Sequence, residues 1–129
     1  MNLAVNFAFV GLGGALGACC RYSMSLLLAD SVKSFPLATL SVNVLGALIA
    51  GFVVTAFFSR GLMPGALQLF IVVGFLGGFT TFSAFSVESL RLLQSGEIFM
   101  AMANILLNVV GSLLAVMLGA YVAAKFMVD

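Results

Sequence analysis

Charged side chains are scarce in this 129-residue sequence. They make up 7% of the residues, against 64% that are apolar, and five basic and four acidic side chains leave a net charge of +1. An ordinary soluble domain carries about a quarter charged residues, so this composition excludes one and indicates a chain that lies in a bilayer. The near-neutral charge also excludes a strongly electrostatic partner such as nucleic acid.

Histidine is absent, and the only two cysteines are the neighbours Cys19 and Cys20. A zinc site or a cysteine–histidine nucleophile has nothing to be built from. Adjacent cysteines inside an apolar run are interpreted as small packing side chains. We therefore expect no enzymatic activity.

Stretches without a charged side chain occur four times, and each is long enough to cross a bilayer. Roughly 20 apolar residues span the hydrocarbon as a helix. The first stretch lacks a basic start, so we expect a permanent helix rather than a cleaved signal. The sequence predicts an all-α integral membrane protein, a single domain over residues 1–129. Its predicted spans lie at approximately 3–28, 35–58, 65–93 and 98–125.

Basic residues are divided almost evenly between the two ends of these spans. Arg60 and Lys125 fall at the end with the termini, and Arg21, Lys33 and Arg91 fall at the other. Because an excess of basic residues sets orientation, so weak a bias permits insertion both ways. Two antiparallel copies would then form a two-fold symmetric dimer. The alternative, that one residue decides a single orientation, stays open.

Small residues at four-residue spacing let helix backbones approach closely. Four helices of this length use their packing surface to hold one another and cannot easily enclose a water-filled path, so an oligomer is expected. The small residues are Gly13 and Gly17 in the first span, Ala47 and Gly51 in the second, and Gly111, Ala115, Gly119 and Ala123 in the fourth.

The third span contains Gly74, Gly77 and Gly78 within five residues. Such a cluster weakens a helix and predicts a break near Gly77. A break frees backbone carbonyls at membrane depth, which is tolerated where protein or water covers them, and freed carbonyls could bind a small cation. The alternative is that these glycines only allow close helix packing.

Phe82 and Phe85 follow the predicted break and share one helical face. Aromatic edges carry partial positive charge, so two edges turned into a narrow path would attract an anion weakly. Weak attraction suits conduction, because the ion must also leave. The alternative is that these rings pack in a core or against lipid.

Uncharged polar side chains recur inside the second and fourth spans. They are costly in hydrocarbon unless partnered, so they face the bundle interior or a path. Amides and hydroxyls can donate to an anion without trapping it by opposite charge. Structural hydrogen bonding between helices is the competing explanation. The residues are Thr39, Asn43, Asn104, Asn108 and Ser112.

Charged residues lie toward the ends of the predicted spans. Arg21 is about 27 Å along a helix begun at Leu3, where it could reach water or draw anions into a vestibule. Glu88 and Arg91 most simply form an interfacial pair. No carboxylate lies mid-span, so a proton-coupled pump lacks its buried acid.

These residues resemble the Fluc (CrcB) family of fluoride channels over nearly the whole chain. The most specific element is the run from Thr80 to Ser86, Thr-Thr-Phe-Ser-Ala-Phe-Ser. The other matching pieces are Gly14–Gly17 with Arg21 and Tyr22, Pro36–Asn43, the remainder of Gly74–Ser86 with Glu88, and Gly111–Ser112.

The resemblance implies an antiparallel, dual-topology homodimer with two fluoride pores and one structural sodium ion at the centre of the interface. It implies that Gly77 and Thr80 supply carbonyl ligands to sodium. The implied pore residues are Phe82, Phe85 and Asn43, with Thr39, Ser83, Asn104, Asn108 and Ser112 beside them and Arg21 at the vestibule.

Three positions depart from the family pattern. Ala84 stands where threonine is common, and Asn104 and Asn108 replace side chains that are often tyrosine, serine or histidine. We expect conduction to survive, because asparagine amides can donate in place of hydroxyls.

The expected function is passive export of fluoride across the inner membrane of a bacterial cell, which lowers fluoride toxicity. A small four-helix multidrug-type transporter is the alternative, although that class needs a mid-membrane carboxylate in its first helix. A purely structural subunit is the third possibility, and it predicts no flux.

Overall fold

The computed structural model describes residues 2–29, 35–58 and 61–126, which form helices and short connections without a strand among them. Four of these helices are long and apolar enough to cross a membrane, so that part of the sequence prediction is confirmed. They are Leu3–Leu27, Leu37–Phe57, Gly65–Gln94 and Ile98–Phe126. Lys33 and Arg60, which entered the orientation argument, lie outside the described residues.

The first two spans are simple in outline. Helix α1 covers Leu3–Leu27 and begins at Asn2, whose side-chain Oδ1 accepts a hydrogen bond from the Ala4 N–H at 3.1 Å. Helix α2 covers Leu37–Val53 and continues as a π-helical segment, η1, over Val54–Phe58.

The third and fourth spans each consist of several segments. The third contains α3 (Gly65–Gln68), the π-helical η2 (Leu69–Leu76), α4 (Gly77–Phe79) and α5 (Phe82–Gln94). The fourth contains α6 (Ile98–Leu106), the π-helical η3 (Leu107–Gly111) and α7 (Ser112–Phe126).

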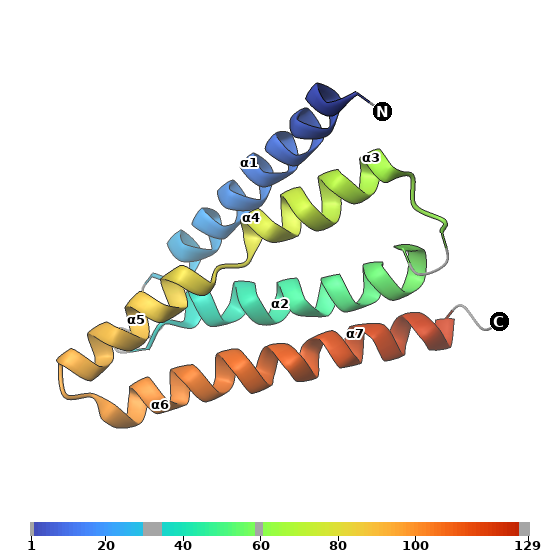
Figure 1. Cartoon of the computed structure of the whole chain (residues 1–129). Coiled ribbons are helices and arrows are strands. Elements are labelled where there is room, and N and C mark those ends of the chain that lie inside the picture. Colours follow the sequence, from blue (N-terminus) through green and yellow to red (C-terminus); the bar gives the residue numbers. More distant parts are fainter. Residues whose placement is uncertain (1, 30–34, 59–60, 127–129) are drawn as a thin grey trace.

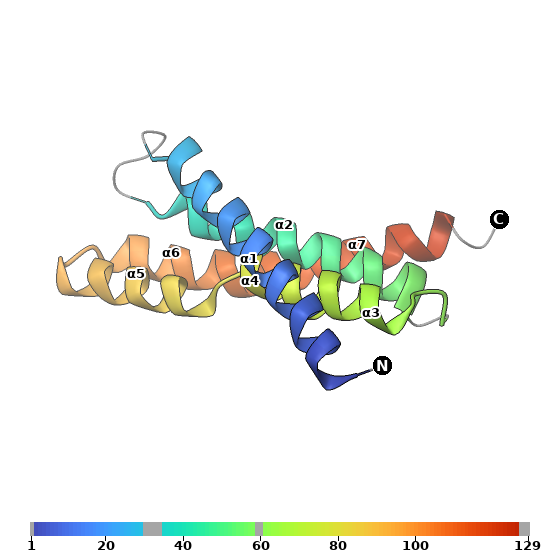
Figure 2. The ribbon, with the colours of Figure 1, turned by 90° about the horizontal axis from the view of Figure 1, so that it is seen from above.

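The four spans pack as two pairs, the second with the fourth and the first with the third, and α5 of the third span also packs on the fourth. Helix α2 lies along α7, and α1 lies along η2 and α4 (Figure 1). Beyond α4 the chain crosses toward the fourth span, where α5 packs on α6. The described ends of the chain lie at the same end of the bundle, and α1 crosses the other spans obliquely (Figure 2).

Close backbone approach within the chain explains several of the small residues. A Cβ atom on Gly17 would meet the carbonyl oxygen of Phe75, and one on Gly119 would meet that of Leu48. Both positions therefore require glycine, because no side chain fits between the two backbones. The first contact joins α1 to the third span, and the second joins α7 to α2.

Candidate functional site

Two extended residues interrupt the third span near its middle. Thr80 (φ −79°, ψ 157°) and Thr81 (φ −152°, ψ 119°) lie between α4 and α5, whereas Gly77 has helical angles (φ −63°, ψ −36°). Thr81 caps α5, because its Oγ1 accepts from the Ala84 N–H at 3.2 Å. Gly77 and Gly78 thus lie in α4, directly before the interruption, and Gly74 lies in η2.

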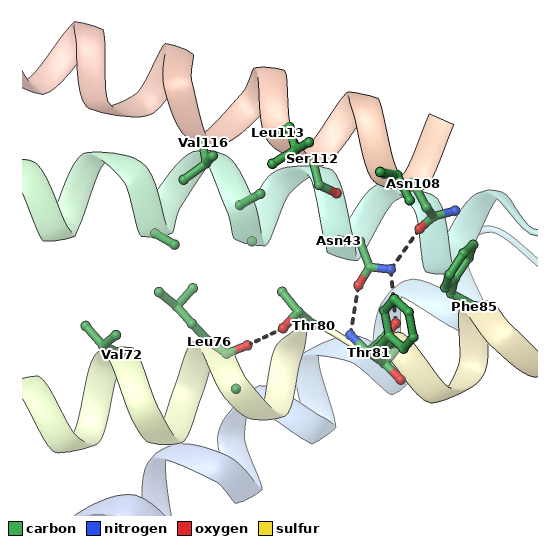
Figure 3. A pocket seen from close by; sticks show the side chains of 16 residues that line it. Asn43, Val72, Leu76, Thr80, Thr81, Phe85, Asn108, Ser112, Leu113 and Val116 are labelled. Carbon is green, nitrogen blue, oxygen red and sulfur yellow. Dashed lines mark hydrogen bonds between the residues drawn. The ribbon is translucent and has the colours of Figure 1, made fainter. Parts of the chain in front are cut away.

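Asn43 of α2 holds the interruption with both ends of its amide. Its Oδ1 accepts from the Thr81 N–H at 2.8 Å, and its Nδ2 donates to the Thr81 carbonyl at 3.0 Å. The Nδ2 also donates to Asn108 Oδ1 at 2.8 Å (Figure 3). One side chain therefore satisfies both backbone groups of an extended residue inside a membrane span.

The interruption redirects two N–H groups that a continuous helix would pair with carbonyls four residues earlier. The Thr81 N–H donates to Asn43 rather than toward Gly77, and the Ala84 N–H donates to the Thr81 hydroxyl rather than toward Thr80. The carbonyls of Gly77 and Thr80 are thereby released from their helical donors. A carbonyl oxygen released in this way can coordinate a cation.

Phe82 and Phe85 meet edge to face at the start of α5, with ring centroids 5.1 Å apart and an interplanar angle of 62°. This arrangement is a favoured one for aromatic pairs. The Phe85 side chain is 7% exposed, whereas that of Phe82 is 75% exposed. The pair thus runs from the interior of the protomer to its surface.

An open hollow of about 640 Å³ lies beside the interruption, between α2, the third span and the fourth span. Figure 3 looks into this hollow, where Asn43, Thr80 and Ser112 come from three different spans. None of the described residues that line it is charged. The hollow therefore offers neutral hydrogen-bonding groups in apolar surroundings.

The structure brings many, but not all, of the predicted site residues to this hollow. Those that line it are Asn43, Phe82, Phe85, Asn108, Ser112, Gly77 and Thr80. Thr39, Ser83, Asn104 and Arg21 are not among its lining residues. Ser83 lies close by, with its Oγ 3.3 Å from Thr81 Oγ1. Arg21 is half-buried on α1, a helix that does not reach the hollow.

The Glu88 carboxylate accepts its hydrogen bond from another span. Its Oε1 accepts from the buried Thr39 hydroxyl at 2.7 Å, while Oε2 is buried without a partner among the described residues. The predicted pairing with Arg91 is present as a charge interaction, while the hydrogen bond of the carboxylate goes to Thr39. Helix α2 thus brings a hydroxyl donor to the carboxylate, while Arg91 stays exposed.

Sequence reasoning missed Ser89, which is buried and connects Asn104 to α5. Asn104 Nδ2 donates to Ser89 Oγ at 3.0 Å, and Ser89 Oγ donates to the Phe85 carbonyl at 2.8 Å. Its position one helical turn after Phe85 was the available signal. Among the described residues, no group of histidine, cysteine and carboxylate side chains could hold a metal ion.

Comparison with known proteins identifies the family. The family model "CrcB-like protein, Camphor Resistance (CrcB)" matches residues 8–120. The fluoride-specific ion channel FluC of Magnetococcus marinus is 46% identical over 116 residues, covering 89% of this chain and 94% of the relative. The FluC proteins of Francisella tularensis subsp. mediasiatica and Chlorobium chlorochromatii are 42% and 38% identical, covering 88% and 98% of this chain and 90% and 98% of their own. This chain, with its interrupted third span and the Asn43 amide bonded to Thr81, thus belongs to the CrcB family.

Proposed function

We propose that this protein is a fluoride channel that lets the ion cross the membrane passively. The relatives named fluoride-specific ion channels support this proposal, since they match nearly the full length of the chain. The observation that carries it is the uncharged hollow beside Thr80 and Thr81, lined by amide, hydroxyl and aromatic groups.

The chemistry of this hollow suits a small anion. Hydroxyl groups donate hydrogen bonds, and the positive ring edges of Phe82 and Phe85 add weak attraction. Among the described residues, none that lines the hollow carries a charge that would trap the ion. An anion can therefore enter and leave, which conduction requires.

A second copy of the chain completes the site in this proposal. Phe82 lines the open hollow and is 75% exposed, so a protomer alone leaves half of the aromatic pair uncovered. The near-even division of basic residues favours an antiparallel partner. The two-fold symmetry of such a dimer gives two equivalent paths.

A sodium ion at the dimer axis fits the backbone of the interruption. The carbonyls of Gly77 and Thr80 are released from their helical donors, and both residues line the open face. Two carbonyls from each copy would surround a monovalent cation with neutral oxygen ligands. The ion would stabilise the meeting of the two interrupted spans.

The proposed location is supported by the spans and by the relatives. The chain is a multi-pass membrane protein, because it has four helices able to cross a bilayer and its relatives are named ion channels. We place it in the inner membrane of a bacterial cell, where outward fluoride flow lowers the cytoplasmic concentration.

Ion release from liposomes tests the function directly. Purified protein is reconstituted with internal fluoride or chloride, and efflux is followed with ion-selective electrodes against empty vesicles. We expect rapid fluoride release with chloride retained. Vesicles shown to contain folded protein that release no fluoride would overturn the proposal. Proton-coupled uptake of a quaternary ammonium compound would instead favour the small multidrug-type transporter.

A further inference from the structure

A continuous chain of hydrogen bonds leaves the third span, crosses to two other spans and returns. We call it the asparagine relay; it consists of Asn43, Asn104, Asn108 and Ser89. It begins at the Thr81 N–H, which donates to Asn43 Oδ1, and ends where Ser89 Oγ donates to the Phe85 carbonyl. The middle links run from Asn43 Nδ2 to Asn108 Oδ1 (2.8 Å), Asn108 Nδ2 to Asn104 Oδ1 (2.9 Å) and Asn104 Nδ2 to Ser89 Oγ (3.0 Å).

The two backbone ends fix the direction of every link. The Thr81 N–H can only donate, and the Phe85 carbonyl can only accept. Each asparagine amide between them has one donating and one accepting end, so turning any one amide would set at least one donor against another donor. The orientation of Asn43 is therefore determined jointly with that of Asn108 and Asn104.

Burial makes the relay costly to interrupt and unsuitable for the anion itself. Asn104 is 0% exposed and Asn108 is 5% exposed. Asn108 Nδ2 also donates to the Asn104 carbonyl at 3.0 Å, so its donors point away from the hollow. Removing a link leaves a buried polar group unpaired, which costs more than the bond itself contributes.

We infer that Asn104 and Asn108 are positioning residues, which orient the Asn43 amide and so hold Thr81 extended, rather than groups that bind fluoride. This inference rests on the proposed function, because the ion path beside Thr80 and Thr81 belongs to that proposal. The hydrogen bonds of the relay do not depend on whether the protein conducts an ion. By taking the Thr81 N–H, the relay also keeps the Gly77 carbonyl free of its helical donor.

Amide hydrogen exchange at threonine tests the relay at one atom. The chain has four threonines, Thr39, Thr55, Thr80 and Thr81, so ¹⁵N-threonine labelling gives four backbone signals in the full-length protein. In Asn108→Leu, we expect Thr81 exchange to accelerate about tenfold or more, with Thr55 unchanged. Asn104→Leu should give a smaller acceleration at Thr81. The matched control is Ser23→Ala, which removes an exposed hydroxyl bonded only within α1.

Either of two results would overturn the relay. One is unchanged Thr81 exchange in folded Asn108→Leu protein. The other is an equal acceleration at Thr55, which would mean that the whole protein has become less stable.

Fluoride efflux measured on the same samples separates this inference from the proposed function. If wild-type protein conducts fluoride and Thr81 exchange is unchanged in Asn108→Leu, the relay is wrong and the proposed function stands. If Thr81 exchange accelerates in Asn108→Leu but wild-type protein does not conduct fluoride, the relay is supported and the channel function is wrong.

A measurement on the unaltered protein applies if the leucine variants fail to fold. ¹⁵N-asparagine labelling reports five side-chain amides, among them the exposed Asn2. We expect the side-chain N–H groups of Asn43, Asn104 and Asn108 to exchange about tenfold or more slowly than those of Asn2. Exchange as fast as that of Asn2 would contradict the relay.

Discussion

At the residue scale, the polar side chains inside the spans show what burial requires. Their uncharged amides in hydrocarbon predicted partners within the bundle, and Asn43 and Asn108 do bond to each other. The sequence could not say which atoms would pair, because that depends on the relative rotation of two helices. Thr81, whose backbone receives the Asn43 amide, carried no sequence signal of that role beyond its place in the run after the glycines.

The two phenylalanines should respond differently to truncation. Phe85 is buried, so Phe85→Ala should lower the free energy of unfolding by roughly 3 kcal/mol through the cavity it leaves. Phe82 is exposed in the protomer, so Phe82→Ala should leave protomer stability nearly unchanged and lower fluoride efflux. Thermal unfolding of the protomer in detergent and liposome efflux measure the two effects. Equal destabilisation by both changes would contradict the placement of Phe82.

At the element scale, local sequence and helix packing make separate contributions to the interruption of the third span. The glycines indicated an interruption near Gly77, yet Gly77 is helical and the extended residues are Thr80 and Thr81. Glycine lowers the cost of leaving the helix. The position at which the backbone leaves it is fixed by the Asn43 amide, which belongs to another span.

The packing of α1 on the third span can be tested with two glycines of one helix. Gly17→Ala places a Cβ against the Phe75 carbonyl and should destabilise the protein by about 1–3 kcal/mol. Gly11 has no atom within 4 Å of the added Cβ, so Gly11→Ala should be neutral or slightly stabilising. Thermal unfolding in one detergent compares them. Similar melting temperatures for the two variants would mean that α1 does not pack as described.

At the scale of the whole molecule, the proposed sodium site predicts cation-dependent assembly. Replacing sodium by a large organic cation at equal ionic strength should lower the dimer fraction, because the Gly77 and Thr80 carbonyls of two copies would then face one another without a cation. Cross-linking of dilute protein gives the dimer fraction. An unchanged fraction after exhaustive sodium removal would exclude this role for the ion.

Dual topology predicts that one loop is found on both sides of the membrane. Ser95 is exposed between α5 and α6, and Ser95→Cys in a Cys19→Ser, Cys20→Ser background provides a single thiol there. An impermeant thiol reagent added to intact cells should label about half of the protein, because the basic residues favour neither orientation. Labelling of nearly all or none would establish one orientation and exclude the antiparallel dimer.

The sequence by itself determined the bilayer environment, the four helical spans and the need of the buried amides for partners. It did so because hydrophobicity, charge and helix length act locally along the chain. Only the tertiary structure decided that Thr39 meets Glu88, that Asn104 lies away from the hollow and that the Thr81 N–H reaches Asn43. Hydrogen bonds are short and directional, so such pairings depend on how the helices are rotated and spaced, which local sequence does not specify.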